Sequence, residues 1–283
     1  MRALLAIAIG AWTAIWLAAT SACAQDIVNI EASQPDASRH VLLQAELHRP
    51  RGEGPFPAVV LMHGCSGWVP AVHHTLHDYA DELSRRGYVA LNLDSFGPRH
   101  YSADEMCASN ARLREALDYR TADAFDALRY LATLPYVDVR NVFLMGQSNG
   151  GSVAMRTAQA SAAKTYDKSG SPGFRGVVAY YPWCGVFAGV VRLAAPIQVF
   201  SGERDEWVSA RECAGVRTSG ADYRVKLYPK AVHSFDLEIA FQRYAGFPIG
   251  RDPEAAEDSR KRMFNFFRDH LSEDQKSTRQ FTD

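Results

Sequence analysis

The chain has 283 residues, of which 47% are hydrophobic and 22% are charged, so it holds enough apolar material to bury a large core. This composition excludes a disordered, collagen-like or small disulfide-stabilised protein. The 31 Lys and Arg residues against 32 Asp and Glu residues leave a formal net charge of -1, too little positive charge to hold nucleic acid or an anionic membrane. We therefore expect a small-molecule partner and no nucleic acid.

Residues 1–24 have the pattern of a secretory signal peptide. Arg2 is the only charged residue of this segment, and an apolar stretch from Leu4 to Ala19 leads into small residues. Cleavage at the end of the segment would leave residues 25–283 as the mature chain, secreted or periplasmic and without a stable membrane partner. A retained membrane anchor and a lipoprotein signal modified at Cys23 are the alternatives.

The rest of the chain is predicted to form one domain, because it contains no internal repeat and no low-complexity linker. Short apolar runs rich in β-branched or aromatic residues predict strands at Val41–Leu47, Ala58–Met62, Tyr88–Leu93, Val142–Met145, Val177–Tyr181, Ile197–Ser201 and Val225–Tyr228. The central runs are almost continuously apolar, as in strands that are covered on both faces. We expect an α/β fold in β-α-β-α order, with a mostly parallel central sheet and helices on both faces.

Helical patterns lie between most of these runs. Apolar residues at helical spacing, such as Leu76, Tyr79, Ala80 and Leu83, predict an amphipathic helix that ends at Gly87. Further helices are expected where Ala124, Leu128 and Leu131 precede Pro135, at Ser152–Ala160, and at Pro253–Leu271. In open parallel sheets the chemistry gathers at the carboxyl ends of the strands, so the residues that leave each strand are the candidates for a site.

A G-x-S-x-G motif leaves the strand Val142–Met145. It reads Gly146-Gln147-Ser148-Asn149-Gly150 and is followed by a predicted helix, which is the strand-turn-helix context of a nucleophile elbow. The turn is so sharp that side chains beside the serine would collide with the strand or the helix, which explains the glycines. We predict Ser148 as a nucleophile, although the motif without this context would be a weak signal.

A serine hydroxyl needs a base within hydrogen-bond distance and an acid that orients the base, and both should follow it in the chain. Asp205 leaves the end of the next-to-last core strand and is the predicted acid, with Glu203 and Glu206 as competitors. His233 lies in the loop after the last core strand and is the predicted base. His270 also follows the serine, but it lies in the C-terminal helix.

The tetrahedral oxyanion needs two preorganised N–H donors. One is expected from Asn149, the residue after the nucleophile, and the other from the loop after an early strand. That loop reads His63-Gly64-Cys65-Ser66-Gly67, and we predict the backbone N–H of Cys65 as the second donor. His63 is expected to brace the loop.

These residues resemble the dienelactone hydrolase family of the α/β-hydrolase superfamily, in its secreted branch with a serine nucleophile. The matching segments are VVLMHGCSGW, GYVALNLDSFGP, LMGQSNGG, YYPWC, FSGERDEWV and YPKAVHSFD. The resemblance implies hydrolysis of an ester or lactone through an acyl-enzyme, with no metal and no organic cofactor. It assigns the nucleophile to Ser148, the acid to Asp205, the base to His233, and the oxyanion donors to Cys65 and Asn149.

The chain departs from the family pattern at two points. Dienelactone hydrolases proper have a cysteine nucleophile, where this chain has Ser148. They also bind a substrate carboxylate with arginines, one of which would stand at Leu237, while Arg99 falls one place away from the other. Dienelactone itself is therefore not the expected substrate.

Aromatic side chains just beyond the strands suggest the wall of a substrate pocket for small or aromatic groups. The candidates are Trp68, Phe96, Tyr181, Trp183 and Trp207, together with Arg99.

Four cysteines remain after the signal peptide, and three full pairings of them exist. In an exported protein they are candidates for disulfides. Cys65 and Cys107 both lie beyond early strands, and Cys184 and Cys213 lie beyond later ones. We predict the pairs Cys65–Cys107 and Cys184–Cys213, which would brace the rim of the site.

The function predicted from the sequence is that of an exported serine hydrolase acting on carboxylic esters or lactones. A serine peptidase of the oligopeptidase type shares the order of these residues, but it usually carries an extra gating domain. A non-catalytic binding protein on the same fold is the alternative from another class.

Overall fold

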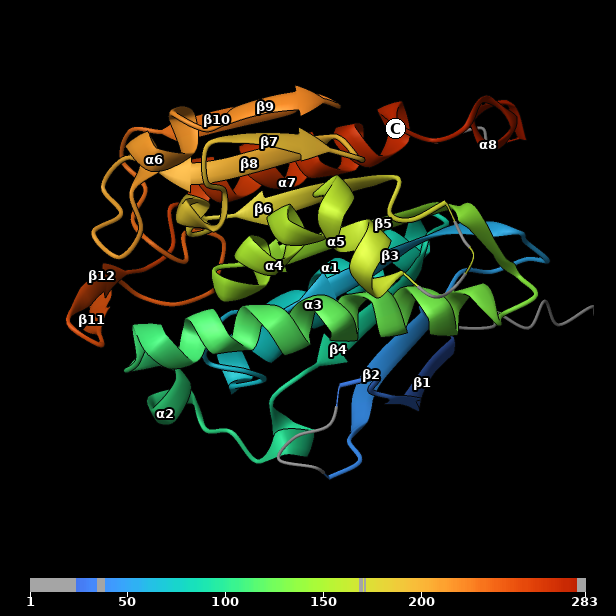
Figure 1. Ribbon diagram of the computed structural model, residues 1–283, viewed down its shortest axis with the longest axis horizontal. Helices are drawn as coiled ribbons and strands as arrows, with labels where there is room; N and C mark the ends of the chain where they lie inside the picture. The colour runs from blue at the N-terminus through green and yellow to red at the C-terminus, as the bar shows by residue number, and fades with distance from the viewer. Residues whose placement is uncertain (1–23, 35–38, 168–169, 171, 279–283) are drawn as a thin grey trace, which may run out of the picture.

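An eight-stranded sheet forms the centre of the molecule, in the order β1-β2-β4-β3-β5-β6-β8-β10 (Figure 1). The computed structural model describes residues 24–34, 39–167, 170 and 172–278. Its strands are β1 (Ala24–Glu31), β2 (Leu42–Arg49), β3 (Phe56–Met62), β4 (Val89–Asp94), β5 (Val137–Gln147), β6 (Gly176–Tyr180), β8 (Ile197–Gly202) and β10 (Tyr223–Tyr228). Except for Ala24, the predicted signal peptide lies outside the described residues.

The predicted parallel sheet is confirmed for the six strands from β4 to β10, which all pair in parallel. β2 pairs antiparallel with both β1 and β4. Among the described residues, no helix lies between β1 and β2 or between β2 and β3, so the expectation of β-α-β-α order throughout is wrong at this edge, and β1 is missing from the predicted elements.

Helices cover both faces of the sheet, as predicted (Figure 1). α3 (Asn110–Ala132), α4 (Asn149–Thr157) and α5 (Ala160–Tyr166) lie on one face, and α1 (Pro70–Arg85) and α7 (Pro253–Asp269) lie on the other. Each layer encloses its own apolar core. The helix predicted at Ser152–Ala160 is displaced, because α4 starts directly after Ser148 and ends before a separate α5.

Smaller elements follow the main strands and form much of the loop region at their carboxyl ends. They are η1 (Gly97–Arg99), α2 (Ala103–Cys107), η2 (Cys184–Val186), α6 (Ala210–Ala214), β11 (Gln242–Tyr244) and β12 (Phe247–Ile249). The pair β7 (Val190–Leu193) and β9 (Arg217–Gly220) lies apart from the main sheet, and α8 (Glu273–Thr278) follows α7.

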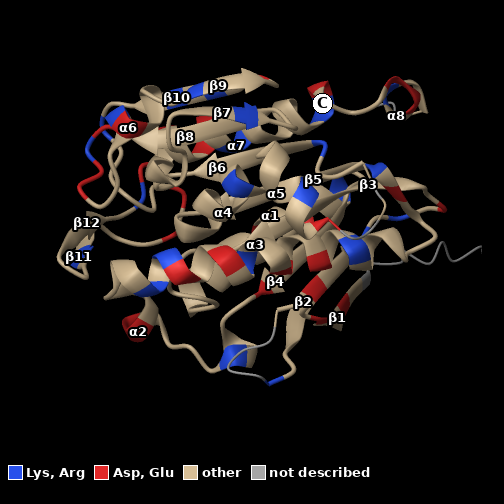
Figure 2. Ribbon diagram, viewed as in Figure 1, with Lys and Arg blue, Asp and Glu red and all other residues tan. Residues whose placement is uncertain are grey.

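Both predicted disulfides are present, Cys65–Cys107 and Cys184–Cys213. Segments with positive and negative side chains are interspersed over the ribbon, in keeping with the net charge near zero (Figure 2). Among the residues that the structure describes, no helix is long and apolar enough to cross a membrane.

Candidate active site

Ser148 stands at the tip of a strained turn between β5 and α4. Its φ of 52° is a backbone conformation that residues other than glycine rarely adopt, and it turns the serine away from both elements. The chain passes so close to itself here that a Cβ on Gly146 would lie 2.0 Å from the carbonyl oxygen of Gly150. A Cβ on Gly150 would lie 2.4 Å from the carbonyl oxygen of Met62. Neither glycine position of the motif therefore has room for a side chain.

Two hydrogen bonds connect Ser148 to His233 and His233 to Asp205. His233 Nε2 lies 2.9 Å from Ser148 Oγ, and His233 Nδ1 lies 2.7 Å from Asp205 Oδ2. The side chain of Asp205 is fully buried, and that of His233 is 2% exposed. A carboxylate at Nδ1 favours the tautomer whose Nε2 lone pair faces the serine hydroxyl.

Backbone donors hold the carboxylate of Asp205 in place. The other oxygen, Oδ1, accepts hydrogen bonds of 2.8 Å and 3.0 Å from the N–H groups of Trp207 and Val208. The competing carboxylates Glu203 and Glu206 are exposed, and Glu206 faces Arg243.

The remaining competitor, His270, caps the end of α7, where its Nδ1 lies 2.8 Å from the carbonyl oxygen of Phe266. It therefore has no part in this arrangement.

The two segments expected to supply oxyanion donors flank Ser148. Asn149 is the first residue of α4, where backbone N–H groups have no partner within the helix. The loop from β3 passes so close that a Cβ on Gly64 would lie 3.2 Å from Ser148 Cβ. Cys65 follows in this loop and lines the same cavities as Ser148.

Arg120 of α3, which was not predicted as a site residue, ties these two segments together. Its guanidinium is buried, donating 2.7 Å hydrogen bonds to Asn149 Oδ1 and to the carbonyl oxygen of His63. Burial lowers the pKa of Arg120 to about 10. The sequence holds a signal that could have identified this buried arginine. Arg120 stands at helical spacing between Ala116 and Ala124, on the apolar face of the helix.

A second unpredicted group, Asp236, lies beneath the site. Its carboxylate accepts hydrogen bonds from Gln147 Nε2 at 2.7 Å, the hydroxyl of Tyr181 at 2.6 Å and the hydroxyl of Tyr79 at 3.2 Å. Burial raises the pKa of Asp236, although these donors act in the opposite direction. Nothing in the local sequence marks this aspartate, because its partners come from three distant segments.

Two adjoining cavities open at Ser148. The larger has a volume of about 350 Å³, and its apolar walls include Val69, Val72, Tyr181, Trp207, Leu237, Ile239 and Ile249. The smaller has a volume of about 150 Å³ and is lined by Asn110, Leu113, Arg114 and Trp183, among others. The predicted pocket residues Tyr181, Trp183 and Trp207 therefore line these cavities, as does Leu237.

The other predicted pocket residues lie elsewhere. Arg99 is buried and forms two 2.8 Å hydrogen bonds with the carboxylate of Asp123, so the expectation that it lines the pocket is wrong. Phe96 packs against His63 in the loop after β3, with the two ring centroids 4.9 Å apart. Trp68 packs on His73, with ring centroids 4.7 Å apart, and does not line either cavity at Ser148.

Solved structures with this architecture include several hydrolases. A dienelactone hydrolase-like promiscuous phosphotriesterase from metagenomic libraries superposes with a TM-score of 0.66 at 19% identity, covering 88% of this chain and 100% of the other. A dienelactone hydrolase from Anabaena variabilis gives 0.59 at 18% identity, with 89% and 100% covered. The propionate-bound Est2 esterase of Thermogutta terrifontis gives 0.54 at 17% identity, with 80% and 89% covered.

These identities are low enough that the structural likeness establishes the fold alone, which is the predicted α/β-hydrolase fold. No curated protein matches the chain. The sequence model described as "Dienelactone hydrolase family" matches residues 43–271, which include every residue of the site described above. The chain therefore belongs to the dienelactone hydrolase family.

Proposed function

We propose that the protein is an exported serine hydrolase that cleaves carboxylic esters or lactones of small substrates through an acyl-enzyme. The observation that carries this proposal is the hydrogen-bonded series of Ser148, His233 and Asp205, with distances of 2.9 Å and 2.7 Å. Family membership supports ester hydrolysis as the reaction class.

In the proposed reaction, His233 Nε2 accepts the Ser148 proton while Oγ attacks the carbonyl carbon of the substrate. Asp205 stabilises the imidazolium, and the N–H groups of Cys65 and Asn149 bind the oxyanion. Collapse of the tetrahedral intermediate breaks the bond to the leaving alkoxide, which takes the proton from His233. Water then attacks the acyl-enzyme with His233 as base, releasing the acid and restoring the serine.

The two cavities support small substrates. Ser148 lines both, so the acyl group and the alcohol group of an ester have separate spaces on either side of the nucleophile. The apolar cavity of about 350 Å³ suits a short aliphatic or aromatic group. Leu237 in its wall supplies no charge for a substrate carboxylate, which argues against dienelactone as the substrate.

An exported location is part of the proposal. Structural disulfides persist in oxidising compartments, and two of them are consistent with a secreted or periplasmic protein. The predicted signal peptide at residues 1–24 accounts for the export.

Hydrolysis of p-nitrophenyl acetate, butyrate and octanoate tests the proposal. We expect turnover that favours the short chains, with a burst of p-nitrophenol when acylation outpaces deacylation. Ser148→Ala should lower kcat by at least about 1,000-fold. Ser161→Ala, an exposed serine of α5, is the control and should leave kcat unchanged. Absence of turnover by the unmodified protein, or equal turnover by Ser148→Ala, would overturn the proposal.

A further inference from the structure

A cluster of histidines and a buried carboxylate lies between β2 and α1, outside the proposed active site. Glu46 and His48 stand two residues apart on β2 and therefore point to the same side of the strand. His73 and His77 stand four residues apart on α1 and therefore share one face of the helix. Strand and helix thus bring four groups with ligating atoms to one place.

The geometry of Glu46, His48 and His77 is close to that of a metal site. Each offers one ligand atom, and the three atoms lie within 4.8 Å of one another. Glu46 Oε2 is 3.9 Å from His48 Nε2 and 3.5 Å from His77 Nδ1. Tetrahedral zinc with bonds of about 2.0–2.1 Å separates its ligand atoms by about 3.4 Å, so binding would draw these atoms closer together by up to about 1.4 Å.

His48 supplies an independent sign of a ligand. Its side chain is only 1% exposed, and its Nε2 has no hydrogen-bond partner. Its other nitrogen, Nδ1, lies 2.9 Å from Asp81 Oδ1. A carboxylate at Nδ1 fixes the tautomer in which Nε2 carries a free lone pair, and this is how proteins orient histidines that bind metals. A buried nitrogen with an unused lone pair would otherwise be costly.

Polar groups around Glu46 hold its carboxylate in one orientation. Asn92 Nδ2 donates to Oε2 at 2.9 Å, and His73 Nε2 lies 2.8 Å from Oε1. These partners fix the orientation of the carboxylate, as outer-shell groups do at metal sites.

We propose that Glu46, His48 and His77 bind one divalent transition-metal ion of the zinc type, with Asp81, Asn92 and His73 as outer-shell partners. Two imidazoles and one carboxylate suit Zn²⁺. Mg²⁺ and Ca²⁺ prefer sites made of oxygen atoms alone, so this set of ligands does not suit them. Water completes the coordination. The ion takes no part in the proposed ester hydrolysis; it ties α1 to β2.

The position of α1 gives this link a consequence for the substrate cavity. Val69 and Val72, at the start of the helix, line the larger cavity next to Ser148. His73 also packs on Trp68, which ends the loop that carries Cys65. An ion that fixes the first turns of α1 would therefore hold this wall of the cavity in place.

The test uses EDTA-treated protein and Zn²⁺ alone as the probe. Calorimetric titration should give one site per chain, and Tm should rise by about 5–10 °C when free Zn²⁺ is 100 times Kd. His77→Gln removes a ligand that is 29% exposed and should leave the fold intact. We expect it to weaken Zn²⁺ binding by more than about 100-fold, since the loss of an outer-shell partner alone costs about 10–100-fold.

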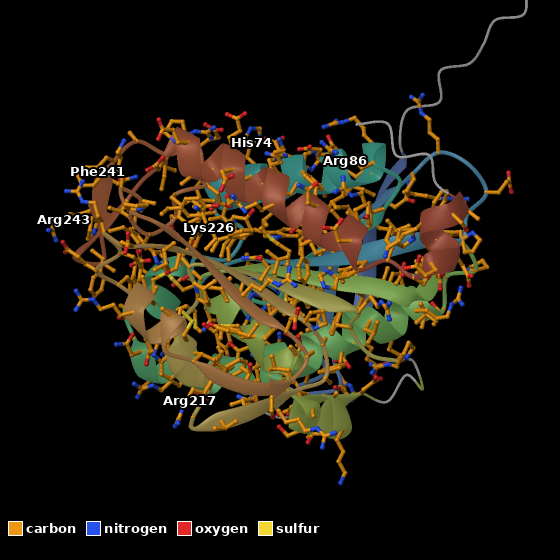
Figure 3. All side chains as sticks on the ribbon, turned by 90° about the horizontal axis from the view of Figure 1, so that it is seen from above. His74, Arg86, Arg217, Lys226, Phe241 and Arg243 are labelled. Atoms are coloured by element: carbon orange, nitrogen blue, oxygen red, sulfur yellow. A yellow bond between two sulfur atoms is a disulfide. The ribbon has the colours of Figure 1, made fainter. Side chains whose placement is uncertain are left out.

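His74→Gln is the matched control on the same helix. Its side chain is 66% exposed, faces Asp78 and lies at the outer edge of the molecule (Figure 3). This variant should bind Zn²⁺ as the unmodified protein does. Equal affinity of His77→Gln and the unmodified protein, or no stoichiometric site in the unmodified protein, would overturn the proposal.

Cobalt gives a second readout that does not depend on stability. Co²⁺ bound by two imidazoles and a carboxylate in tetrahedral geometry should give an intense visible absorption, which Glu46→Gln should abolish. Asp81→Asn should weaken binding by about 10–100-fold while keeping the spectrum, as expected for an outer-shell partner. An unchanged cobalt spectrum in Glu46→Gln would contradict the assignment of this carboxylate.

Discussion

The hydroxyl of Tyr181 donates a 2.6 Å hydrogen bond to Asp236 Oδ1. The ring of the same tyrosine lies 4.6 Å from that of His233, and Asp236 also accepts a hydrogen bond from Gln147, the neighbour of Ser148. One buried carboxylate thus connects the strand before the proposed nucleophile to the loop of the proposed base. We therefore expect this connection to help position the imidazole opposite the serine.

Replacing Tyr181 by Phe should reduce both stability and turnover. Loss of the hydroxyl leaves Asp236 short of a donor and should cost about 1–3 kcal/mol in the free energy of unfolding. A small displacement of His233 should lower kcat about 10–100-fold, with a smaller effect on KM. Ester hydrolysis and urea unfolding measure the two effects.

Tyr228→Phe is the matched control, because the hydroxyl of Tyr228 donates a 2.9 Å hydrogen bond to Asp258 away from Ser148. It should lower stability and leave kcat unchanged. Similar losses of kcat in both variants would contradict a positioning role for Tyr181.

Asp205→Asn tests the proposed acid. The asparagine carbonyl can still accept from the N–H groups of Trp207 and Val208, so the fold should persist. An amide opposite Nδ1 favours the wrong imidazole tautomer, and we expect kcat to fall by about 10,000-fold. Glu206→Gln, at an exposed neighbour, should leave kcat unchanged. Comparable turnover of the two variants would remove Asp205 from the mechanism.

The features predicted correctly from the sequence are those that depend on local pattern. The elbow around Ser148 follows from glycine spacing between a strand and a helix, and the parallel sheet follows from continuous apolar runs. The placement of Asp205 and His233 beside Ser148 follows because the carboxyl ends of parallel strands meet at one edge of the sheet.

The features that were missed depend on contacts between distant segments. Arg120 meets His63 across 57 positions of the chain, and Gln147 meets Asp236 across 89. Arg99 was misplaced for the same reason, since its buried partner Asp123 lies 24 positions further on. The spacing of apolar residues along the sequence does not indicate which distant polar residues will contact each other.

Asp94 should make the stability of the protein depend on pH. Burial raises its pKa, but His63 and the N–H groups of Phe96 and Gly97 outweigh burial and hold the pKa below its usual 3.8. The positive charge of buried Arg120 also faces it. Because the folded pKa is the lower one, the stabilisation is complete above about pH 4 and is lost as pH falls through the folded value.

Asp94→Asn should therefore be less stable than the unmodified protein by about 1–3 kcal/mol at pH 7, with a smaller difference at pH 3. Urea unfolding at the two pH values measures this. Asp222→Asn, at an exposed residue paired with Arg224, should change stability by less than about 1 kcal/mol at both. A difference for Asp94→Asn that is as large at pH 3 as at pH 7 would contradict the charge argument.

Arg120→Lys should impair turnover more than stability. Lysine keeps the buried positive charge but cannot reproduce the planar fork that bonds both Asn149 and the carbonyl of His63. The two segments that carry the proposed oxyanion donors would lose their common anchor, and we expect kcat to fall about 10–100-fold. Arg99→Lys is the control, because Arg99 is equally buried but bonds Asp123. Equal effects of the two substitutions on kcat would argue against a specific role of Arg120.

The two disulfides should contribute similarly to stability and differently to turnover. Cys65–Cys107 closes a separation of 42 residues and Cys184–Cys213 one of 29. Chain entropy then predicts about 4 kcal/mol of stabilisation from each. Cys65 lies in the proposed oxyanion loop, and its partner ends α2, whose residues Ala103 and Asp104 line the larger cavity.

Replacing Cys107 by Ser should free this loop while leaving residue 65 unchanged, and kcat should fall about 10-fold or more as the N–H donor loses its fixed position. In a parallel sample of Cys107→Ser, the free thiol of Cys65 is blocked with iodoacetamide. Comparison of the two samples separates the effect of a reactive thiol from the effect of a more mobile loop. Cys184→Ser with Cys213→Ser should lower Tm to a similar extent but retain kcat, because this bridge joins η2 to α6. If both variants lost kcat in the same proportion to their loss in Tm, neither bridge would have a specific role in positioning the proposed N–H donor.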